Sequence, residues 1–88
     1  MTDHLDKWGP FSPAIKPAER VARCRGLAAV VHLITGPRDN EAVRLLRVAE
    51  HDPSALAEAA KAINALPTID KRGVWATYAT LTRPDRAA

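Results

Sequence analysis

The stretch from residue 18 to residue 34, AERVARCRGLAAVVHLI, constrains the fold of this chain more than any other. Its apolar residues recur every three or four positions and span about 140° of a helical wheel, which is the pattern of an amphipathic helix. The members of this apolar stripe are Val21, Cys24, Leu27, Ala28, Val31 and Ile34. We therefore expect a helix whose stripe forms the centre of the hydrophobic core.

Proline and glycine mark both ends of this helix. Pro17 suits the first helical position, because the N–H that proline lacks would have no partner there. Gly36 supplies the left-handed conformation that ends many helices, and Pro37 prevents the helix from continuing. The sequence therefore predicts a helix over residues 18–35, with Pro17 at its start.

Apolar spacing between capping residues and prolines predicts three further helices, over residues 40–51, 53–66 and 69–82. The clearest local signal is Asp52 followed by Pro53, an N-cap acid before a proline at the first helical position. Asp39 is the expected N-cap of the helix before it. The predicted fold is all-α, a small bundle of four helices joined by short turns.

The second and last helices each present an apolar face. The residues expected on these faces are Ala42, Leu45, Leu46 and Ala49 in the second helix and Val74, Trp75, Tyr78 and Leu81 in the last. Ile69 would lie on the opposite side of the last helix, so either that helix begins nearer Lys71 or it is contacted on two sides. Gly73 indicates a close crossing or a bend in its first turn.

Residues 1–17 differ from the rest of the chain because they hold three of its seven prolines. Prolines at this spacing fix φ and remove backbone donors, so we expect a mostly extended N-terminal arm. A single helical domain then covers residues 18–88. The arm carries Trp8 and Phe11, which either fold back over the bundle or dock on another chain.

The net charge of +3 is concentrated at the C-terminal end. Residues 1–70 hold equal numbers of basic and acidic side chains, whereas the whole excess lies in residues 71–88. The basic residues of that segment are Lys71, Arg72, Arg83 and Arg86. An acidic partner would be attracted to this end of the chain.

Two arginines of the second helix are expected on its exposed side. Arg44 and Arg47 each stand three residues from a glutamate, the spacing of surface ion pairs. The expected partners are Glu41 and Glu50. A solvated helix face is the simpler interpretation, and a binding role for the two arginines is the alternative.

No motif in the sequence supports metal binding or enzyme catalysis. The candidate ligands His4, Cys24, His32 and His51 lack the close spacing of metal sites. Cys24 is expected to be a buried, inert thiol and His32 a half-buried packing residue. No serine or cysteine stands in a nucleophile setting, and the scattered glycines form no phosphate loop. We therefore expect no metal, no cofactor and no enzymatic activity.

The residue types of the last helix favour binding to another protein. Trp, Tyr and Arg are enriched at binding hot spots. Together with the aromatic residues of the arm, the candidate protein-binding residues are Trp75, Tyr78, Arg72, Arg83, Trp8 and Phe11. Alternatively, Trp75 and Tyr78 complete a core that is poor in large side chains. We expect a small non-enzymatic module, such as an adaptor, an inhibitor or a subunit of a larger assembly, that binds another protein or a second copy of itself.

A small nucleic-acid-binding protein or regulator is the second hypothesis. In it, Lys71, Arg72, Arg83 and Arg86 bracket the last helix and neutralise phosphates. Four cations are few, however. The helices over residues 40–66 also lack the glycine turn and polar recognition helix typical of a helix-turn-helix. Protein binding is therefore the first hypothesis.

Composition favours a cytoplasmic protein of a bacterium or a phage. Nine arginines against four lysines, with 17 alanines, are typical of GC-rich bacterial genomes and their phages. One cysteine cannot form an internal disulfide, and the N-terminal residues lack the pattern of a signal peptide. The longest apolar run, residues 27–34, is too short to cross a bilayer, so no membrane partner is expected.

Overall fold

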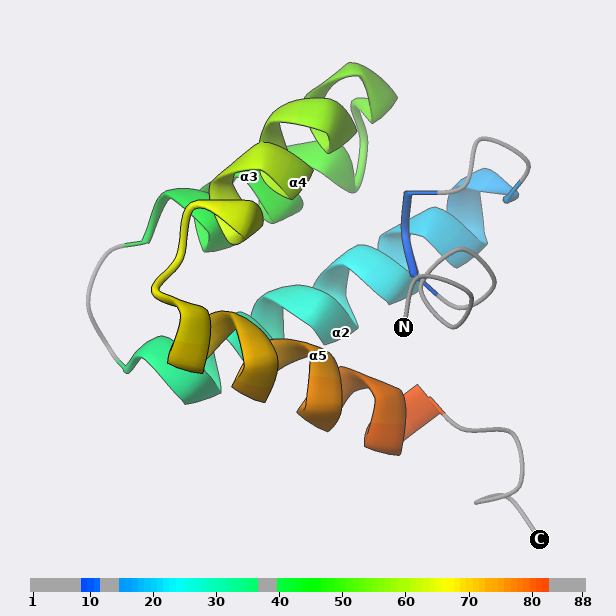
Figure 1. The fold of residues 1–88 in the computed structure, drawn as a ribbon. Coiled ribbons are helices and arrows are strands. Elements are labelled where there is room, and N and C mark those ends of the chain that lie inside the picture. The colour runs from blue at the N-terminus through cyan, green and yellow to red at the C-terminus, as the bar shows by residue number, and fades with distance from the viewer. Residues whose placement is uncertain (1–8, 12–14, 37–39, 83–88) are drawn as a thin grey trace, which may run out of the picture.

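The computed structural model describes residues 9–11, 15–36 and 40–82. Within them the chain forms four α-helices and one short 3-10 helix, with no strand. The elements are α2 (Pro17–Thr35), α3 (Glu41–Ala49), η1 (Pro53–Ala55), α4 (Leu56–Asn64) and α5 (Thr68–Thr82) (Figure 1). The predicted all-α bundle of four helices is confirmed.

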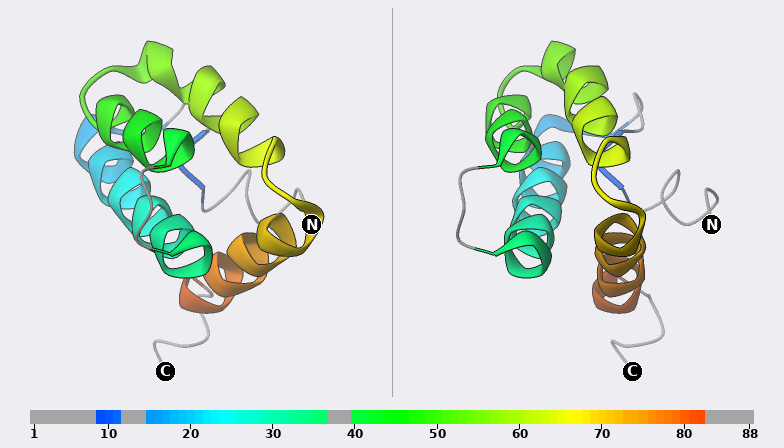
Figure 2. Two further views of the ribbon diagram at one scale, coloured as in Figure 1. Left: turned by 90° about the vertical axis from the view of Figure 1, so that its left-hand side faces the viewer. Right: turned by 60° about the vertical axis from the view of Figure 1, so that its left-hand side comes forward.

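The helices surround one shared interior (Figure 2). Helix α2 packs against both α3 and α5, and α3 also packs against α4. α2 and α5 run antiparallel, because the end of α2 at Ile34 meets Gly73 in the first half of α5, and Gly26 lies near Tyr78 further along α5. A Cβ at Gly73 would lie 3.4 Å from Cγ2 of Ile34, so the side chain of Ile34 packs on α5 at this glycine.

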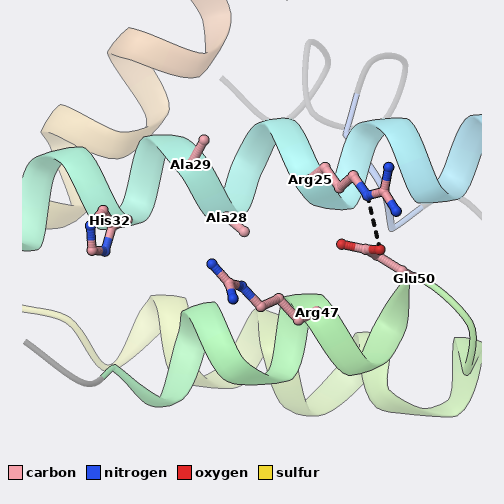
Figure 3. Close-up of a pocket in the computed structure, with 6 residues that line it drawn as sticks. All are labelled: Arg25, Ala28, Ala29, His32, Arg47 and Glu50. Atoms are coloured by element: carbon pink, nitrogen blue, oxygen red, sulfur yellow. Dashed lines mark hydrogen bonds and ion pairs between the residues drawn. The ribbon is translucent and has the colours of Figure 1, made fainter. Parts of the chain in front are cut away.

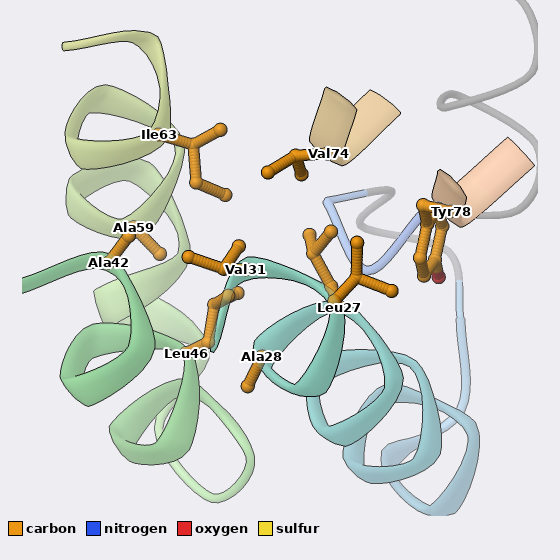
Figure 4. Packing of buried hydrophobic residues seen from close by; sticks show 10 residues of the cluster. Leu27, Ala28, Val31, Ala42, Leu46, Ala59, Ile63, Val74 and Tyr78 are labelled. Atoms are coloured by element: carbon orange, nitrogen blue, oxygen red, sulfur yellow. The ribbon is translucent and has the colours of Figure 1, made fainter. Parts of the chain in front are cut away.

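The buried surface of α2 is wider than its predicted stripe. Cys24, Leu27 and Val31 are fully buried as expected, but Val30 is also buried although it lies outside the stripe. The reason is that α2 has neighbours on two sides, so a broader sector of its surface is removed from water. All four helices contribute to the main core, whose members include Leu27, Leu46, Ile63, Val74 and Tyr78 (Figure 4).

Helix α3 begins on a different cap from the predicted one. The N-cap is Asn40, whose side chain accepts a hydrogen bond of 2.8 Å from the backbone N–H of Ala42. Asp39 lies outside the described residues. Leu46 is fully buried, whereas Leu45, expected on the same face, is only half-buried.

The helix predicted over residues 53–66 is divided into two elements. Asp52 is the cap, as expected, and its side chain accepts from both the backbone N–H and the hydroxyl of Ser54. The turn that it caps is the 3-10 helix η1, and the regular helix α4 begins only at Leu56 and ends at Asn64. Proline at the first position is compatible with either helix type, so the sequence signal marked the start without specifying the type.

Helix α5 begins at Thr68, which includes Ile69 in its first turn. Neither predicted explanation for Ile69 is correct, because its side chain is 80% exposed instead of being contacted by a second neighbour. Leu81 was expected on the apolar face, yet it is 61% exposed in the last turn of the helix. Val74 and Tyr78, between these ends, are buried.

The described part of the N-terminal segment folds back onto the bundle. Gly9, Pro10 and Phe11 form a bend and a turn, and Phe11 packs against the main core. The carbonyl of Gly9 accepts a hydrogen bond of 3.1 Å from Nη1 of Arg23 in α2. The alternative in which Phe11 covers the bundle is therefore the observed one. Trp8 lies outside the described residues.

Alanine substitutions at Gly26 and Gly36 should change the stability in opposite directions. The nearest heavy atom that a Cβ at Gly26 would meet is Tyr78 Cε1, at 3.9 Å. Gly26→Ala should therefore stabilise the fold by about 0.5–1 kcal/mol through the higher helix propensity of alanine. Gly36 has a φ of 90°, so Gly36→Ala should destabilise it by about 1–2 kcal/mol. Thermal unfolding followed by circular dichroism measures both shifts, and a lower Tm for Gly26→Ala would contradict the observed packing.

Candidate functional site

The structure separates the predicted binding residues of α5 into core and surface. Tyr78 is only 2% exposed and belongs to the main core. Burial raises the pKa of its phenol to about 12. Trp75 is half-buried and packs against the same core. The burial of Tyr78 favours the alternative in which this residue completes the core.

The basic segment is described only at its first end. Lys71 is half-buried and Arg72 is exposed, both in the first half of α5. Arg83 and Arg86 lie outside the described residues. The predicted bracket of cations around the last helix therefore stays a prediction.

Two exposed side chains and one half-buried side chain follow one another around α5 from its first turn. Ile69, Arg72 and Trp75 recur at three-residue intervals, which is the spacing of one ridge on a helix surface. We call these three residues the α5 ridge. Leu33, which is 71% exposed, lies at the same end of the α2–α5 pair, next to the Ile34 that packs on Gly73. The most exposed large aliphatic residues of the described chain, Leu33 and Ile69, therefore belong to two neighbouring helices.

A groove of about 540 Å³ lies between α2 and α3. Its lining residues are Arg25, Ala28, Ala29, His32, Arg47 and Glu50 (Figure 3). Nε of Arg25 donates to Oε1 of Glu50 at 3.1 Å, so the largely buried carboxylate of Glu50 is bound to α2. The rest of the wall on the α3 side comes from Arg47.

Two predictions about the residues near this groove are wrong. Arg44 does pair with Glu41, as expected, but Glu50 pairs with Arg25 instead of with Arg47. His32 is exposed and not half-buried. The Glu50 pairing differs because the packing of α3 against α2 brings Glu50 within reach of Arg25 on a different helix.

Sequence reasoning missed the groove because two helices form it. Arg25, Ala29 and His32 recur at intervals of four and three residues, so their spacing could have indicated one wall. The opposite wall depends on which side of α3 faces α2. That orientation follows from the buried positions of Leu46 and Ala49, which the sequence predicted without naming the helix that they would meet.

Cys24 is a fully buried side chain, as predicted. Burial and then the nearby carboxylate of Glu50 raise the pKa of the thiol from 9.0 to about 11, and Arg20 lowers it by a smaller amount. The thiol is therefore protonated at neutral pH. No group of three His, Cys, Asp or Glu side chains in the described part of the chain could hold a metal ion.

A scan against protein-family models and searches of curated proteins and of solved structures give no match to this chain. None of the described helices has the length and apolar character needed to span a membrane.

Proposed function

We propose that this chain is a small, non-enzymatic, cytoplasmic protein-interaction module that binds through the α5 ridge together with Leu33. The observation that carries the proposal is the exposure of Ile69 and Leu33, at 80% and 71%, on adjoining helices at the same end of the molecule. Single exposed aliphatic residues are common on protein surfaces, whereas a contiguous apolar face is typical of interfaces, and we propose that these two residues belong to one such face.

The chemistry of the ridge describes the partner that would fit it. Ile69 offers aliphatic area, Trp75 offers part of an aromatic ring and Arg72 adds a positive charge between them. Tryptophan and arginine are enriched at hot spots of binding energy. The partner is therefore a protein surface with apolar areas on either side of an acidic group, belonging either to another protein or to a second copy of the chain.

Replacing Leu33 and Ile69 together by glutamine should abolish this association and leave the fold intact. Glutamine has a good helix propensity and both native side chains are exposed, so the free energy of unfolding should change by less than about 1 kcal/mol. Sedimentation of the purified protein measures self-association. Capture of partners from the host, with and without nuclease treatment, measures binding to other molecules.

Val48→Gln is the matched control, because Val48 is a partly exposed aliphatic residue on α3, 48% exposed and away from the ridge. We expect the native protein and Val48→Gln to bind a second protein in stoichiometric amount, or to form a dimer, with or without nuclease treatment. The double variant should form no such complex. A complex that the double variant retains would contradict the proposed face. A complex that nuclease destroys would favour nucleic-acid binding.

A further inference from the structure

We propose that the groove between α2 and α3 binds the phosphate group of a small phosphate monoester, held between Arg47 of α3 and His32 of α2. Figure 3 shows the Arg47 side chain extending from α3 toward α2, with its guanidinium between His32 and the Arg25–Glu50 pair. The groove lies on the α3 side of α2, and its lining residues include neither Leu33 nor any residue of the α5 ridge. Phosphate binding there does not require the proposed protein-binding function.

Arg47 is available to a ligand because its expected partner is occupied elsewhere. The ion pairs among the described residues do not include Arg47. Glu50, three residues further along the chain, instead accepts from Nε of Arg25 at 3.1 Å. The guanidinium of Arg47 presents five N–H donors in one plane. An exposed guanidinium in a groove is the side chain best suited to an oxyanion.

The positions of the donors favour phosphate over carboxylate. A carboxylate has two oxygens in one plane, and a single arginine satisfies both in a bidentate pair. Such a ligand would leave His32 on the opposite wall unused. A phosphate monoester has three terminal oxygens arranged in three dimensions, so it can accept from Arg47 on one side and from the imidazole on the other.

The Arg25–Glu50 pair determines where in the groove the anion lies. The Glu50 carboxylate repels an anion from its own end, and its charge is balanced by Arg25. The positive charge left over is that of Arg47. The anion is therefore directed to the His32 end of the groove.

The size of the groove leaves room for an organic group next to the phosphate. Its volume of about 540 Å³ falls within the range of about 300–1,000 Å³ that is typical of small-molecule sites. Ala28 and Ala29 line it without long side chains that would fill it. A monoester with a compact apolar or aromatic group therefore fits better than inorganic phosphate alone.

The test is a titration of the full chain with phenyl phosphate and, in parallel, with inorganic phosphate, followed by backbone amide NMR. Saturable shifts at residues 25–32 and 47–50 are expected, with phenyl phosphate binding at least about threefold more tightly. Equal affinities for the two probes would overturn the assignment to a monoester. The absence of saturable shifts at millimolar concentrations of either probe would overturn the site itself.

Arg47→Gln should weaken the binding of phenyl phosphate about tenfold, and His32→Gln about threefold. Arg44→Gln is the control, because Arg44 lies one turn away on the same helix, is exposed, and pairs with Glu41. All three side chains are exposed, and the amide spectra of the variants verify that the fold is intact.

Arg47→Lys keeps the charge and loses the planar fork, so its affinity for phenyl phosphate should lie between those of the native protein and Arg47→Gln. Equal weakening by Arg44→Gln and Arg47→Gln would show attraction by net charge alone and would overturn the proposal.

Discussion

Leu46→Ala should lower the free energy of unfolding by about 2–5 kcal/mol, which is the range for removing a large aliphatic side chain from a packed core. Leu46 is fully buried in the cluster shared by all four helices (Figure 4). The substitution leaves a cavity where α3 packs against α2. A chain of 88 residues has little stability in reserve, so the expected fall in Tm is about 10 °C or more. Urea unfolding followed by circular dichroism measures the change.

Leu33→Ala is the matched control for this prediction, because it removes the same atoms from a side chain that is 71% exposed. Its free energy of unfolding should change by no more than about 0.5 kcal/mol. Similar losses for the two variants would contradict the assignment of Leu46 to the core and of Leu33 to the surface.

Raising the pH above about 9 should weaken the fold through two buried acids. Burial raises the pKa of Cys24 from 9.0 to about 11 and that of Tyr78 from 10.0 to about 12. In each case the folded protein keeps a proton that the unfolded chain has already lost. The stabilising effect is therefore complete below the unfolded pKa and is lost as the pH rises, between 9.0 and about 11 for Cys24 and between 10.0 and about 12 for Tyr78.

Cys24→Ala and Tyr78→Phe separate the two contributions. Each variant should flatten its own part of the alkaline decline, and the double variant should remove both. Urea unfolding at a series of pH values from about 8 to about 12 gives the free energy of unfolding at each pH. The slope of this free energy against pH, and not its absolute value, is compared between the variants and the native protein. An alkaline decline of the same steepness in the double variant and the native protein would refute the role of these two groups.

Local signals predicted the ends of a helix correctly where a proline, a glycine or a capping side chain stands at its boundary. Pro17 and Gly36 bound α2, and the acidic cap at Asp52 marks the start of η1, because these residues act on their own backbone. The signals were weaker where two neighbouring residues could serve the same purpose. Asn40 caps α3 in the place expected for Asp39, since asparagine and aspartate are both favoured N-cap residues.

The candidate sites were predicted only in part because they depend on contacts between helices. Periodicity identified Tyr78 as apolar but left open whether it was a core or a binding residue, and its burial is decided by the approach of α2. The ion pair of Glu50 also depends on packing. Arg47 has the correct spacing to pair with Glu50 on its own helix, but Glu50 pairs with Arg25 of α2 instead. Spacing along one helix describes which partners are in reach, and packing decides which are chosen.

The sequence by itself determined the helical class, the approximate ends of α2 and α5, and the apolar residues at the centre of the core. These follow from backbone chemistry and from the 3.6-residue period, both of which are local. Only the tertiary structure decided that Val30 is buried, that Ile69 is exposed and that a basic groove lies between α2 and α3. These properties depend on the angular position of one helix around another, which is settled by the packing of all four helices together.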